Sequence, residues 1–380
     1  MAKLGKIKEI GIISIGDIIG GALGGIFWFY LASQMEPDVY GEIQWFLGIA
    51  AALSYIALFG SQNTIIIYVA KNIKIQSTFN FISLVSSFLI SLIVILVFPS
   101  FYKIDIGLIL FAYVINSLAI SDLLGRKLYS SYSKYELLQK ILTVVLGIGF
   151  FHLIGYEGII LALAFSYVFY LKRIIQNFKE MKIDFSLLKS RIGFITNNYL
   201  LVLLSGFQGQ VDKILVVPFL GFTILGNYSL ALQMLAVLMI LPNILFKYFL
   251  SEDASGNSNR KIKIFGILGS IIISFLGILL LPTLIPIFFP KFTSTVEIIP
   301  IISIFVIPNT VSLFWESKLL SELKSKYVLV GNLISFGVMI SGMIILGTML
   351  GIVGIAISLL LNSLVRCSIF YYGIKKLDVS

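Results

Sequence analysis

The sequence predicts an all-α membrane protein with about twelve transmembrane helices in two six-helix lobes, related by pseudo-twofold symmetry. The composition is the first indication, because 58% of the 380 residues are hydrophobic and 12% are charged, with a mean hydropathy of +1.02. Soluble domains carry about a quarter charged residues. The second is the recurrence of apolar runs of about 20 residues, which suffice to cross a hydrocarbon core of about 30 Å. The third is an internal repeat that divides the chain in half.

Short polar breaks separate the apolar runs and set the expected spans. The segment MAKLGKIKEI precedes a run that is too long for the apolar region of a signal peptide and lacks an A-x-A-like cleavage site, so we expect the first span to be retained. The expected spans lie near residues 10–34, 41–69, 80–100, 105–125, 138–155, 157–173, 192–218, 226–250, 262–288, 294–316, 327–348 and 351–373.

The distribution of Lys and Arg orients these spans. Basic residues gather beside one set of span ends, whereas the opposite set keeps Lys103 and Lys291 and begins with the acidic loop MEPDVYGE. The positive-inside rule therefore predicts a multi-pass protein of the cytoplasmic membrane with both termini cytoplasmic. The net charge of +10 is spread over these short loops, so it indicates contact with anionic membrane lipids and argues against nucleic acid as a partner.

The internal repeat predicts the domain organisation. SKYELLQKI at 133–141 matches SKYVLVGNL at 325–333, GYEGIILALAFSYVF at 155–169 matches GIVGIAISLLLNSLV at 351–365, and the turns around Gly41 and Gly226 align. We expect an N-terminal lobe at 1–170, a cytoplasmic amphipathic linker at 171–191 and a C-terminal lobe at 192–380. Repeats with an even number of spans share one membrane orientation, and the cleft between them suits alternating access.

The first span carries an acid near its start. An ionisable side chain within a span costs about 2.5–3.5 kcal/mol on insertion scales and normally faces protein or a wet cavity. Asp17 lies beside a ridge of small residues formed by Gly16, Gly20 and Gly24, and no basic residue of the same helix can reach it. We therefore expect a functional role for Asp17.

The seventh span has the most polar sequence. Four of its residues repeat at helical spacing and predict one wet face that lines a cavity: Asn198, Ser205, Gln208 and Asp212. Asp212 and Lys213 are sequence neighbours and do not face each other on a helix, so Lys213 needs a different partner or a cavity. A structural pair that reaches between helices and a role in substrate binding are both open for Asp212 and Lys213.

Acids also lie near the inner ends of the fourth and tenth spans. Asp122, with Asn116 and Ser117 above it, and Glu316 occupy similar places in the two halves. Interfacial capping or salt bridges to Arg126 or Lys318 are the favoured interpretation, and Asp122, Arg126 and Glu316 are candidates for the inner mouth of a cavity. The single Cys367 and the single His152 supply too few ligands for a disulfide or a metal cluster, so we expect no metal and no cofactor.

Two passages carry a family resemblance: the PDVYGEIQWF turn after the glycine-rich first span, and VDKILVVPFLGFTILGNYSLALQ, which opens the second half. With the two six-helix lobes, they make the whole chain similar to the polysaccharide-transporter branch of the multidrug/oligosaccharidyl-lipid/polysaccharide exporter (MOP) superfamily, the O-antigen-type lipid-linked oligosaccharide flippases. The resemblance implies a MATE-like fold and translocation of a polyprenyl-pyrophosphate oligosaccharide to the outer leaflet, for cell-surface polysaccharide or glycoprotein synthesis. It also implies a cationic cavity, whereas these spans hold little positive charge beyond Lys213.

Asp17 resembles the ion-coupling carboxylate of multidrug exporters in the same superfamily, which would make H⁺ or Na⁺ a partner. The alternative function is therefore an ion-coupled exporter of drugs or small metabolites. A polyprenyl-glycan polymerase or ligase also has about twelve spans but needs a sizeable outer loop with catalytic residues, and the outer loops here are a few residues long. We therefore expect a transporter and not an enzyme.

Overall fold

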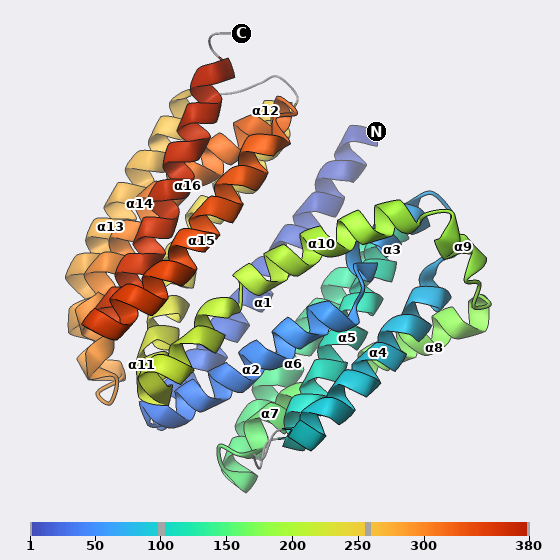
Figure 1. Ribbon diagram of the computed structural model, residues 1–380, viewed down its shortest axis with the longest axis horizontal. Helices are drawn as coiled ribbons and strands as arrows, with labels where there is room; N and C mark the ends of the chain where they lie inside the picture. Colours follow the sequence, from blue (N-terminus) through green and yellow to red (C-terminus); the bar gives the residue numbers. More distant parts are fainter. Residues whose placement is uncertain (1, 98–102, 255–259, 378–380) are drawn as a thin grey trace. The chain divides into compact units, whose positions relative to one another are not determined.

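The computed structural model contains helices and no strand in the part of the chain that it describes, which is the backbone of residues 2–97, 103–254 and 260–377 and the side chains of residues 16, 18–97, 104–250, 252–253 and 261–376. Helices are the expected form because a backbone in lipid must satisfy its hydrogen bonds internally. In chain order (Figure 1) they are α1 (Ala2–Gln34), α2 (Pro37–Ala57), α3 (Ser61–Ala70), α4 (Gln76–Val97), α5 (Lys103–Gly125), α6 (Tyr129–Ile154), α7 (Gly158–Phe165), the short 3₁₀ helix η1 (Val168–Tyr170), α8 (Leu171–Glu180), α9 (Ser186–Lys189), α10 (Ile192–Gln208), α11 (Val211–Leu238), α12 (Ile240–Ala254), α13 (Arg260–Phe288), α14 (Thr293–Ser321), α15 (Ser325–Leu350) and α16 (Ile352–Leu377).

Nine described helices are long and apolar enough to cross a membrane, and the pair α2 and α3, bent by 49°, would make a tenth. The all-α membrane fold is confirmed, but this number is below the expected twelve. The described apolar part of α1, Ile18–Gln34, is short, as is Ile240–Leu250 of α12. Gly221, with φ 81° and ψ 176°, breaks the helix α11, so the expected seventh and eighth spans are divided among α10, α11 and α12.

The chain divides into two compact units. Unit 1 comprises Met1–Trp28 and Trp45–Val211, and unit 2 comprises Phe29–Gln44 and Asp212–Ser380. The division differs from the expected lobes: residues 192–211 belong to the first unit, and the turn between α1 and α2 belongs to the second. The reason is packing, because α10 lies against α3 of unit 1 and a later segment, α11, carries the chain into unit 2.

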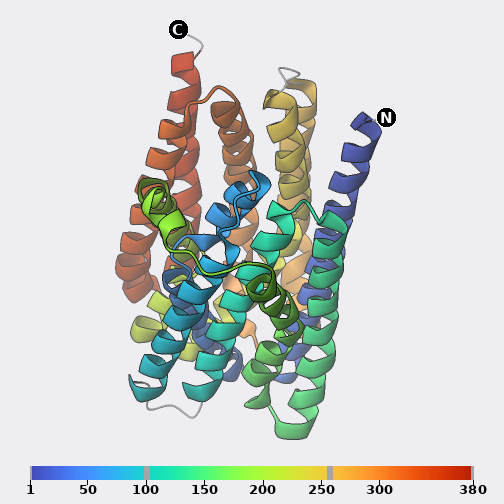
Figure 2. The same cartoon turned by 90° about the vertical axis from the view of Figure 1, so that its right-hand side faces the viewer.

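Each unit has its own helix packing. In unit 1, α5 packs against α3, α4, α7 and α8. In unit 2, α14 packs against α12, α13 and α16, and α15 packs against α16; the four helices α13 to α16 can be followed from yellow-orange to red in Figure 2. The many apolar side chains that stay exposed on these bundles, for example Phe88 of α4 and Phe265 of α13, are those expected to face lipid.

The expected surface linker, residues 171–191, is partly buried. Helix α8 continues from α7 through η1, and Gly158–Glu180 together are long and apolar enough to cross a membrane. On α8 the side chains of Arg173, Ile174 and Asn177 are buried against unit 1, whereas Ile175 is exposed. Residues 171–180 are therefore part of the packed unit, because α8 packs against α4 and α5 and its buried Arg173 and Asn177 bond to Asp122 and Arg126.

Repeat-related glycines occupy special positions. Gly155 ends α6 with φ 91° and Gly351 ends α15 with φ 60°, conformations that favour glycine, and the sequence alignment pairs these two residues. A Cβ on Gly41 would overlap the carbonyl oxygen of Phe222, and one on Gly226 would overlap that of Pro37. Helices α2 and α11 therefore approach within unit 2 at the glycines that the repeat predicts to correspond.

Candidate functional site

A buried carboxylate near the end of α5 organises one polar cluster of unit 1. Asp122 is 0% exposed and accepts three hydrogen bonds. Arg126 Nε (2.8 Å) and Gln76 Nε2 (3.1 Å) donate to its Oδ1, and Arg173 Nε of α8 donates to its Oδ2 at 2.5 Å. The predicted salt bridge between Asp122 and Arg126 is therefore confirmed, with Arg173 as a second cation.

Arg126 extends this cluster towards the surface. Its Nη2 donates to Asn177 Oδ1 at 3.1 Å and lies 2.8 Å from Glu180 Oε2, at the end of α8. Burial opposes the charged form of Arg126, but the hydrogen bonds to Asp122 and Glu180 outweigh it and hold the pKa of this guanidinium above its usual value. The side chain is 26% exposed, so Arg126 connects a buried acid with a solvent-facing one.

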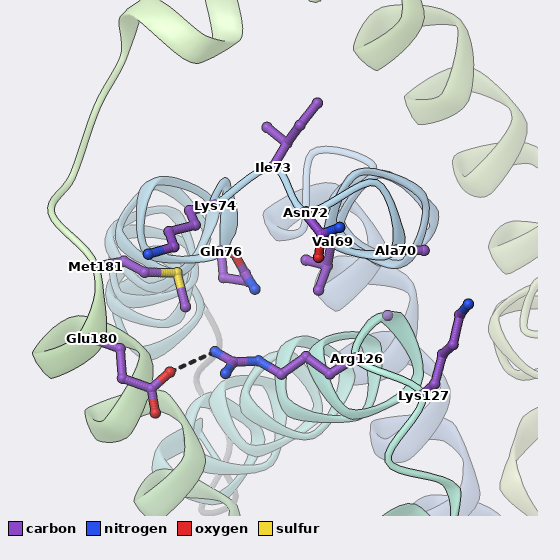
Figure 3. Close-up of a pocket in the computed structure, with 11 residues that line it drawn as sticks. Val69, Ala70, Asn72, Ile73, Lys74, Gln76, Arg126, Lys127, Glu180 and Met181 are labelled. Carbon is purple, nitrogen blue, oxygen red and sulfur yellow. Dashed lines mark ion pairs between the residues drawn. The ribbon is translucent and has the colours of Figure 1, made fainter.

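A cavity of about 650 Å³ opens beside this cluster (Figure 3). We call it the basic cavity, because three basic residues and one acidic residue line it. Figure 3 shows Lys74, Gln76, Met181, Glu180 and the head of Arg126 on one side, and Lys127 farther along on the other. Its lining comprises Val69, Ala70, Asn72, Ile73, Lys74, Gln76, Gly125, Arg126, Lys127, Glu180 and Met181.

A second cavity of unit 1, of about 490 Å³, has a different chemistry. We call it the tyrosine cavity, since three tyrosines line it together with amides and hydroxyls, and none of the described residues in its lining is Asp, Glu, Lys, Arg or His. The lining residues come from α2, α3 and α5 and from three turns, which lie between α2 and α3, between α7 and η1, and before α11. They are Ala51, Ser54, Tyr55, Leu58, Gln62, Asn63, Ile66, Tyr113, Asn116, Ser117, Ile120, Ser121, Tyr167 and Gln210.

Packing fixes the tyrosines of this cavity. Tyr113 and Tyr167 meet edge to face with ring centroids 5.8 Å apart, and the ring of Tyr55 occupies the place that a side chain on Gly206 would need. Asn116 Oδ1 is buried without a hydrogen-bond partner among the described residues. The cavity thus presents held aromatic faces together with amide and hydroxyl groups that can donate and accept hydrogen bonds.

The expected wet face of the seventh span is divided between the units. In unit 1, Asn198 is buried and its Nδ2 donates to Gly60 O at 2.7 Å and to Thr64 Oγ1 at 3.0 Å, which ties α10 to α3. Ser205 is exposed and bonds to the backbone of its own helix, and Gln208 is partly buried at the end of α10. Of these three, Asn198 has a structural contact that the sequence did not identify.

Asp212 and Lys213 belong to unit 2. Asp212 is buried, accepts a hydrogen bond from Tyr228 Oη at 3.1 Å and caps the backbone N–H of Lys213 at 2.8 Å. Lys213 Nζ donates to Gln44 Oε1 at 3.0 Å. The expectation that Lys213 needs a partner other than Asp212 is therefore confirmed, and Gln44 and Tyr228 are residues that sequence reasoning missed.

Two candidate acids remain, Glu316 and Asp17, and the structure describes the side chain of the first of them. Glu316 of α14 is partly buried and interacts electrostatically with Arg366 of α16. The side chain of Asp17 lies outside the described residues, although the backbone of α1 runs through that position. Among the described side chains, no group of three His, Cys, Asp or Glu residues lies close enough together to hold a metal ion.

Sequence reasoning missed two further sets of functional candidates. Arg173 was counted as a topology-determining charge, and its position directly after an apolar run was the available signal for a buried partner of Asp122. Tyr55 lies on α2, Tyr113 on α5 and Tyr167 in the turn before η1, and no spacing in the sequence shows that these three segments meet.

Solved structures resemble this chain over nearly its whole length. An inward-facing multidrug resistance MATE family transporter of the MOP superfamily matches with a TM-score of 0.71 and 14% identity, covering 98% of each chain. The lipid II flippase MurJ in an inward closed conformation matches with a TM-score of 0.72 and 13% identity, covering 96% of this chain and 87% of that one. The chain has the fold of these transporters.

A MOP superfamily transporter from Pyrococcus furiosus, described as having a binding pocket of reversed polarity and a suggested different function, matches with a TM-score of 0.62 and 13% identity over 98% of this chain and 96% of that one. No protein-family model and no curated protein sequence matches. At these identities the likeness concerns the fold, and the choice of substrate depends on the residues that line the cavities.

Proposed function

We propose that this protein flips a polyprenyl-linked pyrophosphate oligosaccharide from the cytoplasmic to the outer leaflet by alternating access, for cell-surface polysaccharide or glycoprotein synthesis. The observation that carries this proposal is the tyrosine cavity, whose described lining is polar and aromatic but has no charged side chain. A neutral, hydroxyl-rich sugar suits such a lining, because ring faces pack on its C–H groups while amides and hydroxyls bond its oxygens.

The same lining disfavours a cationic drug as the main substrate. An organic cation that enters a low-dielectric cavity loses more hydration energy than contacts with aromatic faces return, so it needs a carboxylate as counter-charge. The tyrosine cavity offers the faces of Tyr55, Tyr113 and Tyr167 but, among its described residues, no carboxylate. The fold supports both classes, because its solved neighbours include a multidrug transporter and a lipid II flippase.

The alternative is an H⁺- or Na⁺-coupled exporter of drugs or small metabolites, with Asp17 as the ion-coupling residue. Protonation would remove the cost of burying this carboxylate in α1, so release of an ion could be linked to rocking of the lobes. If an Asp17→Asn protein transports at the wild-type rate under every ion gradient applied, Asp17 does not couple ions to transport.

The topology belongs to the same proposal. Two six-helix lobes with cytoplasmic termini would leave the outer ends of the helices joined by short turns, as the acidic loop after the first span indicates. Asn198, Ser205, Gln208, Asp212 and Lys213 are the proposed substrate contacts, and Asp122, Arg126 and Glu316 are the proposed residues of the inner mouth.

The function is tested in host cells depleted of the protein, by mass spectrometry of lipid-linked glycans combined with a leaflet-accessibility assay. We expect an intact lipid-linked oligosaccharide to accumulate on the cytoplasmic leaflet. Re-expression of the wild-type protein should restore its movement. Normal glycans together with altered sensitivity to toxic cations would contradict the flippase and favour the exporter.

A further inference from the structure

The basic cavity has a charge that transport of a neutral sugar does not use. Its described lining contains Lys74, Arg126 and Lys127 against one acid, Glu180. Lys74 lies in the turn before α4, Arg126 and Lys127 follow α5, and Glu180 ends α8. In a chain whose helices span a membrane, the ends of helices lie at the level of the lipid headgroups, where basic residues meet anionic lipid.

We propose that the basic cavity binds the phosphate group of an anionic membrane lipid, with Arg126 and Lys74 as its main donors and Lys127 at the rim. Arginine matches a phosphate with two parallel N–H groups, and lysine adds a mobile point charge. In Figure 3 the heads of Lys74 and Arg126 lie on the same side of the cavity, next to Gln76, whereas Lys127 is set apart.

Two acids hold Arg126 in different ways. Asp122 is 0% exposed and is shared with Arg173, so its bond to Arg126 Nε orients the guanidinium from behind. Glu180 is 40% exposed and meets Nη2 at 2.8 Å from the surface side. An exposed carboxylate loses little by returning to water, so an incoming phosphate can replace Glu180 at Arg126 while the buried pair with Asp122 stays intact.

The volume fits this assignment. About 650 Å³ is more than one phosphate needs and leaves room for a diphosphate with the group attached to it. The balance of three basic residues to one acidic residue leaves two positive charges for such an anion before Glu180 is displaced, and one more afterwards. This site rests on the proposed function for the identity of the lipid, since the carrier of a polyprenyl-linked oligosaccharide bears a diphosphate.

The test is isothermal titration of the purified full-length protein with farnesyl diphosphate and, separately, with inorganic pyrophosphate. We expect the double variant Lys74→Gln/Lys127→Gln to bind farnesyl diphosphate about tenfold more weakly, because two charged contacts are lost. Glu180→Gln should bind severalfold more tightly, because it removes the competing carboxylate. Lys182→Gln is the matched control: it removes an exposed charge two residues beyond Glu180 that is not part of the cavity lining, and it should leave the affinity unchanged.

Each outcome decides the assignment. Tighter binding of farnesyl diphosphate than of pyrophosphate would support the lipid as the source of the phosphate, and equal binding of both would overturn the lipid and leave a soluble phosphate. Equal affinity of all variants would overturn the site itself. Because these measurements use purified protein and no transport, a failure here is distinct from a failure of the proposed function, which the glycan measurements in depleted cells decide.

Discussion

Both units bury an acid beside a cation, but they hold it differently. In unit 1, Asp122 binds two arginines, and one of them, Arg126, also reaches an exposed acid and the basic cavity. In unit 2, Asp253 at the end of α12 binds Lys263 Nζ with both oxygens, at 2.8 and 2.6 Å, and Ser317 Oγ at 2.7 Å. The side chain of Lys263 is 15% exposed and lies over the ring of Phe249, 5.3 Å from its centre.

The pair in unit 2 has largely buried partners, whereas the cluster in unit 1 also includes an exposed acid, Glu180. Asp253 and Lys263 satisfy each other, with a hydroxyl and an aromatic ring completing the shell, which is the arrangement of a structural ion pair. Arg126 divides its hydrogen bonds between a buried acid and a surface acid, so one of its partners is free to exchange. Of these two buried pairs, the one in unit 1 therefore leaves a cation that a substrate or a lipid can reach.

The largest expected loss of stability comes from replacing the buried acid of unit 1, Asp122, and replacing Asp253 of unit 2 should cost less. Asp122→Ala leaves the buried Arg173 without its carboxylate, and an arginine cannot lose its charge, so we expect a cost of about 3–5 kcal/mol. Asp253→Ala leaves Lys263, whose flexible side chain is 15% exposed and can turn its ammonium group to water, so this variant should lose less. Thermal unfolding of both variants in detergent, at equal protein concentration, measures the difference. Equal destabilisation would show that the two pairs do not differ in this way.

A smaller effect is expected from the third partner of Asp253. Ser317→Ala removes one buried hydrogen bond to a carboxylate and should cost about 1.5–3 kcal/mol. Ser312→Ala is a suitable control, because the hydroxyl of this buried residue of the same helix bonds to the backbone of Pro308 and not to an acid. If the two variants unfold at the same temperature, Ser317 does not stabilise the charge of Asp253.

The smallest effect is expected at the surface acid of unit 1. Glu180→Gln removes an ion pair whose carboxylate is 40% exposed, and such pairs contribute about 0–1 kcal/mol. Its unfolding temperature should stay close to that of the wild-type protein, in contrast to Asp122→Ala. A loss of stability as large as that of Asp122→Ala would show that Glu180 is part of the buried core and not an exchangeable partner.

The fold class could be predicted because it depends on composition and on spacing along the chain. Apolar runs of membrane length follow from the cost of polar groups in lipid, and the repeat correctly paired Gly155 with Gly351 as the glycines that end two corresponding helices. The boundary between the two units could not be predicted from spacing along the chain. Asn198 and Asp212 lie at helical spacing, but the helix ends between them at Gln208, so the two residues pack in different units.

The candidate site was predictable only in part. The pairing of Asp122 with Arg126 follows from their separation by four residues on one helix face. Arg173 and Gln76 reach Asp122 from other helices, which is information that local spacing does not contain. The tyrosine cavity could not be predicted for the same reason, since its lining comes from segments that are far apart in the sequence, from Ala51 to Gln210.

The central claim is that the tyrosine cavity accepts the sugar of a lipid-linked oligosaccharide. It is tested most directly by the rate at which the purified protein, reconstituted in liposomes, moves a fluorescent lipid-linked oligosaccharide between leaflets. We predict that Tyr113→Ala, which removes one wall of the cavity, lowers this rate at least tenfold, whereas Tyr156→Ala, at an exposed tyrosine outside the lining, leaves it unchanged. Transport by Tyr113→Ala at the wild-type rate would contradict the account.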